Sequence, residues 1–302
     1  MCDLESNALD PTSDFVVENC QEFNNSDTRS ETRGSYVGKL SSAPGQSTAI
    51  ANALSQQIIH QMNLIIPNVL VSFDDLNIAP GEAAYPLVQP QAKQALAKAI
   101  QDRGKTMTLN SGYRTIAQQF LLYSWYHGRS PVAPVGLSNH QDGLAIDIDD
   151  ARGWEPYLRK YGWYPLAGDP PHFDFDSSKK LGTEELGSTA ILAFQQLWNK
   201  NNPSQKITED GKYRLGGETE SALSREPAQG FAKAPWDKNP RLLRLTKPLM
   251  EGSDVIKLQQ KLNIADDGMF GADTNKAVKE FQQKKSLTAD GIVGSKTWQA
   301  LG

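Results

Sequence analysis

Apolar residues recur at helical spacing in two segments of the first third of the chain. Ala, Ile and Leu follow this period from Thr48 to Leu64 and again from Gln89 to Arg103, which predicts two helices. Gly104 follows the second segment directly, where a helix commonly ends in a residue of left-handed conformation. We therefore expect two helices separated by a loop, the second ending at Gly104.

The next part of the chain changes to the alternation of apolar and polar residues that is typical of strands. Three short strands are predicted, over Thr106 to Asn110, Leu144 to Ile148 and His172 to Phe175. We expect them to form an antiparallel sheet with flanking helices, in a small α+β domain.

A further helix is predicted between the first two strands. It follows the turn Ser111 to Arg114 and runs to about His127, with Gln118 and Gln119 expected at its surface. The segment from Gly128 to Ser138 is rich in Pro and Gly, which favours a surface loop.

The last part of the chain contains an internal repeat with a period of 23 residues. Asp267, Gly268, Gly271, Thr274 and Ala277 fall on Asp290, Gly291, Gly294, Thr297 and Ala300. In each copy the Asp-Gly-x-x-Gly loop predicts a turn and the Thr begins a helix. A looser third copy, with two extra residues in its loop, runs from Phe194 through Asp210 and Gly211 to Ala222. It is either a degenerate repeat or a helical extension of the preceding domain.

These patterns divide the chain into four parts. We expect a disordered tail over residues 1–47, the α+β domain over 48–180, the extension or degenerate repeat with a linker over 181–239, and an all-α module of three helices over 240–302. The linker is expected from Phe231 to Asn239, which contains Pro235.

Charge and hydropathy exclude several classes of protein. The net charge is −4 and no basic stripe occurs, which argues against nucleic-acid binding. No segment approaches the roughly 20 apolar residues of a membrane span. The stretch from Met1 to Asp27 is acidic and polar, so we expect no signal peptide there. The oligomeric state does not follow from the sequence.

The candidate chemistry lies in two segments that bring together histidine and carboxylate. A catalytic zinc site takes three such ligands and leaves a fourth position open, and His140, Asp147 and His172 supply this set. Alternation along the strands places Asp147 on the face opposite Ile146 and Ile148. One face of the sheet would then carry the site and the other the core.

Neighbouring residues complete this hypothesis. Asp169, three residues before His172, is the candidate general base, and Arg114 is the candidate for binding an oxyanion or a substrate carboxylate. Asp149 is the alternative to Asp147 as a ligand. Asp174 is either a partner that orients a ligand histidine or a solvated residue.

The segment from Ser138 to Asp147 resembles the Ser-x-His-x-x-Gly-x-Ala-x-Asp signature of the VanY-type DD-peptidases. Ser111 to Arg114 and Asp169 to Phe173 resemble the family's other two blocks, in the same order, and the resemblance covers Asn63 to Phe175. It implies a zinc metallopeptidase, with Zn2+ as cofactor, that acts on the stem peptide of peptidoglycan.

The same blocks provide the candidate substrate-binding residues. These are Ser111, Tyr113 and Ser138, with core packing as the alternative for Tyr113. The carboxypeptidases usually carry Glu where this chain has Asp169. Asp occurs there in the related L-alanyl-D-glutamate endopeptidases of phage lysins, so the bond cleaved stays open.

The repeat from Arg241 to Leu301 is similar to the peptidoglycan-binding domain found beside many wall hydrolases. Together the two resemblances imply a D-alanyl-D-alanine carboxypeptidase anchored to the cell wall, acting in the wall or periplasm. The alternatives are an L-alanyl-D-glutamate endopeptidase and a wall-binding protein without catalytic activity.

Overall fold

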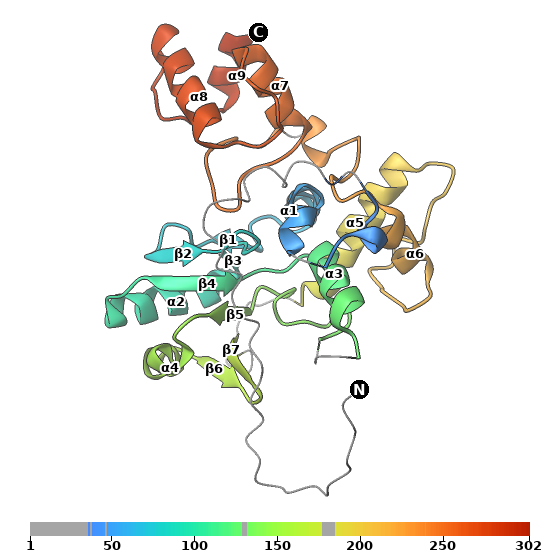
Figure 1. Cartoon of the computed structure of the whole chain (residues 1–302), viewed down its shortest axis with the longest axis vertical. Helices are drawn as coiled ribbons and strands as arrows, with labels where there is room; N and C mark the ends of the chain where they lie inside the picture. The colour runs from blue at the N-terminus through green and yellow to red at the C-terminus, as the bar shows by residue number, and fades with distance from the viewer. Residues whose placement is uncertain (1–35, 37, 46, 129–131, 177–184, 239) are drawn as a thin grey trace, which may run out of the picture.

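The computed structural model describes residues 36, 38–45, 47–128, 132–176, 185–238 and 240–302. Its elements form three buried hydrophobic clusters: one between helices and a sheet, one mainly among helices, and one in the C-terminal module. Figure 1 shows the sheet on one side of the molecule and the group α1, α3, α5 and α6 on the other.

The five-stranded sheet is mixed, with the order β2-β4-β5-β7-β6. The strands are β2 (Ile78–Pro80), β4 (Met107–Ser111), β5 (Ala145–Ile148), β6 (Trp163–Leu166) and β7 (Asp169–Phe175). All neighbouring pairs are antiparallel except β2 and β4, which are parallel. The α+β fold and the three predicted strands are confirmed, whereas the prediction of a wholly antiparallel sheet is wrong for this one pair.

Two helices cover the core face of this sheet. These are α2 (Pro90–Arg103) and α4 (Ala151–Lys160), and they share a buried cluster with Ile146, Ile148 and Phe173. Gly104 ends α2 in the left-handed conformation, with φ of 65°, as predicted. A small separate sheet pairs β1 (Val71–Ser72) with β3 (Leu87–Val88).

The helices of the second group are far apart in the sequence, because they come before, between and after the strands of the sheet. It comprises α1 (Asn52–Ile65), α3 (Ile116–Tyr126), α5 (Gly187–Asn201) and α6 (Glu218–Arg225), with the short helices η1 (Leu40–Ser42) and η2 (Thr48–Ala51). Leu40 is buried in this cluster and its backbone N–H donates to Glu226 O at 3.0 Å. The expected disordered tail is therefore wrong for residues 38–45. Residues 1–35 lie outside the described part.

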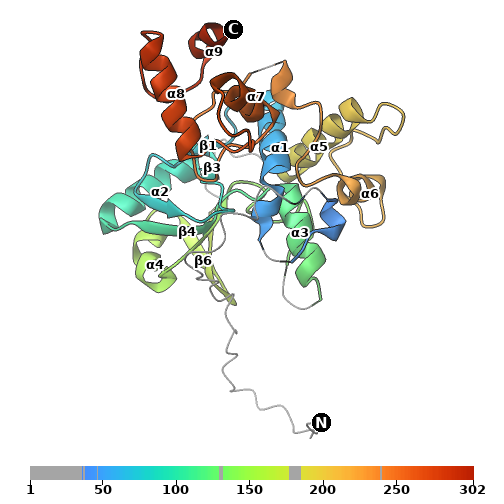
Figure 2. The same ribbon diagram turned by 45° about the horizontal axis from the view of Figure 1, so that its top comes forward.

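The C-terminal module has three helices and a core of its own, as predicted. The helices are α7 (Ser253–Leu262), α8 (Ala272–Lys284) and α9 (Ser295–Leu301). Both views place this module beyond the end of α1 (Figure 2). The segment expected as a linker is packed instead, because Phe231 and Trp236 are buried and η4 (Pro235–Asp237) lies within it.

No helix of the described residues is long and apolar enough to cross a membrane.

Candidate metal centre

A tight turn presents the first candidate ligand. Between Ser138 and Gly143 the backbone closes on itself, with Gln141 N–H donating to Ser138 O at 2.8 Å and Gly143 N–H donating to His140 O at 3.3 Å. Gly143 has φ of 66°, a conformation that favours glycine. An added Cβ there would stand 2.6 Å from Leu70 Cδ2. The turn thus needs glycine to lead from His140 into β5.

Strand register brings the other two candidate ligands together. Asp147 on β5 is directly opposite His172 on the antiparallel strand β7, and directly opposed residues have side chains on the same face of a sheet. Ile146 and Phe173, one position earlier and later, belong to the core cluster on the other face. The predicted alternation is therefore observed in these strands, with the core on one face and the two candidate ligands together on the other.

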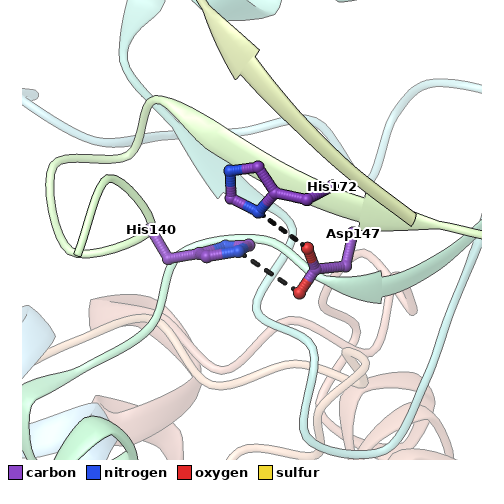
Figure 3. A group of neighbouring side chains, drawn as sticks. All are labelled: His140, Asp147 and His172. Carbon is purple, nitrogen blue, oxygen red and sulfur yellow. Dashed lines mark hydrogen bonds and ion pairs between the residues drawn. The ribbon is translucent and has the colours of Figure 1, made fainter. Parts of the chain in front are cut away.

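The three side chains converge (Figure 3). His140 Nε2 lies 3.2 Å from Asp147 Oδ2, and His172 Nδ1 lies 3.0 Å from Asp147 Oδ1. One ligand atom from each residue falls within 4.8 Å of the other two. Ligands at the usual 2.0–2.2 Å from a tetrahedral zinc ion stand about 3.3 Å apart. Two histidines and a carboxylate at these separations fit such an ion.

Hydrogen bonds fix the direction of each ring. His140 Nδ1–H donates to Gly112 O at 2.8 Å, which leaves Nε2 facing Asp147. His172 Nε2–H donates to Asp174 Oδ1 at 2.9 Å, while its Nδ1 faces Asp147. A partner on the far nitrogen is how proteins orient a metal-binding histidine.

The site is largely withdrawn from solvent, and its groups shift one another's pKa values. Burial, together with Arg114, lowers the pKa of His140. Burial would raise the pKa of Asp147, but the two histidines and Arg114 hold it well below its usual range. Burial would lower the pKa of His172, yet its bonds to Asp147 and Asp174 raise it to about 9. Asp147 is thus ionised, as a ligand must be.

Arg114 is anchored at the edge of the group. Its Nη2 donates to Ser111 Oγ at 3.1 Å and to Asp147 Oδ2 at 3.2 Å, and its Nη1 donates to Gln119 Oε1 at 3.2 Å. Its backbone N–H also donates to His140 O at 3.1 Å. The guanidinium is therefore held in one place beside the candidate ligands.

Asp169 is the first residue of β7, next to a register shift opposite Leu166. The sequence predicted a Pro-rich turn here, and the structure makes Asp169 to Pro171 the start of the strand. Burial and the neighbouring Asp147 raise the pKa of Asp169, against the opposing effect of His172. A carboxylate with a raised pKa is the stronger base.

The three candidate substrate-binding residues have different surroundings. Ser111 is half-buried and accepts from Arg114, and Ser138 is buried in the turn before His140. Tyr113 is 1% exposed, and its hydroxyl contacts Met62 Sδ at 2.8 Å. This placement favours the packing alternative for Tyr113.

The sequence did not predict that two glutamines of α3, Gln118 and Gln119, are buried near the candidate ligands. Gln119 was expected at the surface, but it is fully buried, and it bridges Arg114 and Ala133 O. Gln118 is buried as well, in a capping box with Thr115 at the start of α3. The Thr-x-x-Gln spacing was a visible signal for this cap.

Asp149, the alternative ligand, lies elsewhere. It is exposed and accepts from Asn110 Nδ2 at 2.8 Å, outside the group that Asp147 forms with the two histidines.

Family comparisons agree with this geometry. Residues 88–162 match the family model described as D-alanyl-D-alanine carboxypeptidase, VanY, and residues 251–301 match a putative peptidoglycan-binding domain. The VanY match contains Arg114, His140 and Asp147 and ends before Asp169 and His172, whose assignment rests on this chain's own motif and contacts. A comparison with curated proteins finds no match.

The VanY-type segment and the peptidoglycan-binding segment together support a peptidase that acts on peptidoglycan. The group of His140, Asp147 and His172 could hold a metal ion; the first two residues lie within the VanY-type segment and His172 lies beyond its end. The peptidoglycan-binding match further indicates a protein associated with the cell wall.

Proposed function

We propose that this chain is a zinc-dependent peptidase that hydrolyses the stem peptide of peptidoglycan. The observation that carries the proposal is the convergence of His140, Asp147 and His172 within 4.8 Å, next to a segment that matches the VanY family. Two imidazoles and one carboxylate form a ligand set typical of catalytic zinc, and an ion that binds here would displace the proton that His172 holds between Nδ1 and Asp147.

The mechanism assigns separate tasks to the surrounding side chains. Zinc, when bound, supplies Lewis acidity that polarises the scissile carbonyl and makes water a better acid. Asp169 accepts the proton of the attacking water and returns it to the leaving amine. Arg114, held by Asp147, Ser111 and Gln119, offers a fixed guanidinium to the oxyanion or to the substrate carboxylate.

The bond cleaved is proposed to be the D-alanyl-D-alanine bond at the end of the stem, because the VanY family model carries that activity. One residue favours a second candidate. Asp169 stands where the carboxypeptidases usually have Glu, as in the L-alanyl-D-glutamate endopeptidases. The shorter side chain brings the base closer to the backbone of β7, so it suits a differently placed scissile bond.

The C-terminal module is proposed to hold the enzyme on the cell wall or in the periplasm beside its polymeric substrate. Retention near a polymer raises the local concentration of cleavable bonds without any new catalytic contact.

Product analysis tests the proposal. The purified protein is incubated with peptidoglycan and with a pentapeptide ending in D-Ala-D-Ala, with and without a chelator, and the products are identified by mass spectrometry. We expect release of free D-Ala that stops when the metal is removed and returns with added Zn2+. Metal-dependent cleavage inside the stem would establish the endopeptidase instead. Binding without any cleavage would overturn the enzymatic assignment.

A further inference from the structure

Helices α5 and α6 enclose the same hydrogen-bond network as the two C-terminal repeats. Gln195 Nε2 donates to Asp210 Oδ1 at 3.1 Å and to Thr219 Oγ1 at 3.0 Å. Its Oε1 accepts from Gly211 N at 2.9 Å, and Gly211 has φ of 65°. One buried glutamine thus closes the Asp-Gly loop onto the following helix.

Both C-terminal copies repeat these contacts atom for atom. Gln259 bonds Asp267, Gly268 and Thr274, and Gln282 bonds Asp290, Gly291 and Thr297. In all three copies the residue after the glycine donates its N–H to the aspartate and accepts from the glutamine. The upstream segment is therefore a third copy of the repeat, built into the core of the helical group.

The upstream copy differs from the other two in its loop. Nine positions separate Asp210 from Thr219, against seven between Asp267 and Thr274. The longer loop, residues 211–215, forms one wall of a cavity of about 620 Å3. The opposite wall is the segment 134–137 together with Asp142.

That opposite wall belongs to the turn that carries His140. Asp142 is two residues beyond His140, and its Oδ1 accepts from Leu186 N at 2.7 Å and Gly187 N at 3.0 Å, at the start of α5. Gln141 Oε1 accepts from Gly136 N at 2.8 Å. The cavity and the metal centre thus share one fixed turn. Figure 1 shows α5 and α6 beside α1 and α3, apart from α7, α8 and α9.

The cavity offers both apolar and charged surface. Leu137 and Leu215 are 73% and 63% exposed, and Lys212 and Arg214 supply two cations. Glu185 also lines the cavity, whereas the Asp142 carboxylate is occupied by the two backbone N–H groups of α5. The volume falls within the usual 300–1,000 Å3 of ligand sites.

We propose that this cavity is a subsite for the stem peptide of peptidoglycan, binding the part of the peptide away from the scissile bond. Stem peptides carry carboxylates and the methyl groups of alanine, which match the two cations and the exposed leucines. Arg214 pairs with Asp210 at 3.2 Å, with its side chain 61% exposed. Such a surface pair contributes little, so Arg214 exchanges partners at low cost. The proposal rests on the proposed peptidase function.

The kinetic test compares substrates of two lengths. The holoenzyme and the variant Lys212→Ala/Arg214→Ala are assayed with a stem pentapeptide and with an N-acylated D-Ala-D-Ala dipeptide. We expect KM for the pentapeptide to rise about five- to tenfold, as for the loss of two exposed ion pairs, and kinetics on the dipeptide to stay unchanged. The matched control is Lys206→Ala/Lys233→Ala, which removes two exposed lysines outside the cavity.

A binding test keeps this inference separate from the proposed function. The pentapeptide is titrated into the metal-free full chain, and amide shifts are followed by NMR. Shifts at Gly136, Gly211 and Leu215 that disappear in the double variant support the subsite, even in a protein that cleaves nothing. Equal KM values for the double variant and its control overturn it, even in an active enzyme. Shifts confined to α7, α8 and α9, or produced equally by glycan fragments without peptide, also overturn it.

Discussion

Removal of the Asp174 carboxylate tests whether the His172 ring is held in place for a metal ion. The ring lies between two carboxylates, with Nδ1 3.0 Å from Asp147 Oδ1 and Nε2 2.9 Å from Asp174 Oδ1. The same Asp174 oxygen accepts from Asn139 Nδ2 at 2.8 Å. When Nδ1 serves an ion, Nε2–H keeps its bond to Asp174, and this bond holds the ring in the orientation that directs Nδ1 at the ion.

The magnitude follows from that single bond. Loss of the outer partner of a metal-binding histidine typically reduces metal affinity about 10- to 100-fold, which corresponds to roughly 1.4–2.7 kcal/mol. A charge-assisted hydrogen bond contributes about 1.5–3 kcal/mol, so the two figures agree. We expect the Kd for Zn2+ to rise by this factor in Asp174→Ala. Asp174→Asn should lose less, because its amide oxygen still accepts from Nε2–H.

Zinc affinity is measured by competition with a chromophoric chelator, and circular dichroism checks that each variant is folded. The matched control is Asp149→Ala, which removes an exposed carboxylate two residues after Asp147 and outside the metal group. A Kd for Asp174→Ala within about twofold of the wild-type value would refute this reasoning, since the expected loss is at least tenfold. An equal loss in Asp149→Ala would show that general charge, not ring orientation, sets the affinity.

Three further predictions concern the base, a buried acid and the turn glycine. Asp169→Asn should lower kcat by about 10²- to 10⁴-fold and leave the Kd for Zn2+ unchanged, measured by peptide turnover and metal titration; wild-type turnover would contradict the assignment. Burial raises the pKa of Glu226 from 4.5 to about 8, so the contribution of this group to stability is full below about pH 4.5 and is lost as pH rises from there through 8. Glu226→Gln should abolish that loss, so melting temperatures at pH 5 and pH 9 should favour the variant only at the higher pH; a constant difference would refute the shift. Gly143→Ala should lower the free energy of unfolding in urea more than Gly104→Ala does. Both glycines have positive φ, which costs an alanine about 1–2 kcal/mol, but of the two only Gly143 has a neighbouring atom where the Cβ would stand. Equal losses of free energy would show that the turn tolerates the methyl group.

The candidate ligands were predictable from the sequence because their placement depends on local rules. Strand alternation alone separates Asp147 from Ile146, and the His172 strand follows the same rule. Only the pairing of β5 with β7 had to be right for the two residues to meet. The pattern placed His172 at the start of its strand, whereas the observed β7 begins three residues earlier, at Asp169.

Residues that act through distant contacts were not predictable in this way. Gln119 is polar and lies on a helix, so the sequence alone favours exposure to solvent. In the structure its side chain is buried and donates to Ala133 O. Leu40 stands in a stretch without any period, and it is buried in a cluster that includes Leu223 and Ala228, far along the chain. Such contacts belong to the tertiary fold and leave no periodic signal.

The C-terminal module is the clearest case in which the structure changes the functional argument. A flexible linker before Arg241 would raise only the local concentration of substrate. Instead, the Arg241 guanidinium lies 3.6 Å from the Trp236 ring and bonds Asp254 through two nitrogens, at 2.9 and 3.0 Å. Its Nη1 also donates to Gln56 Oε1 at 2.7 Å, and Gln56 is a buried residue of α1.

These contacts tie the module directly to the helix that supports α5 and the third repeat. Gln56 further accepts from Glu251 N at 2.8 Å and donates to Leu249 O at 2.7 Å, so a single side chain of α1 bonds three residues of the module that precede α7. Under the proposed function, a wall strand bound by α7 to α9 would therefore meet the peptidase domain at a set angle. Orientation, and not only concentration, would then decide which stem peptides the His140 turn can reach.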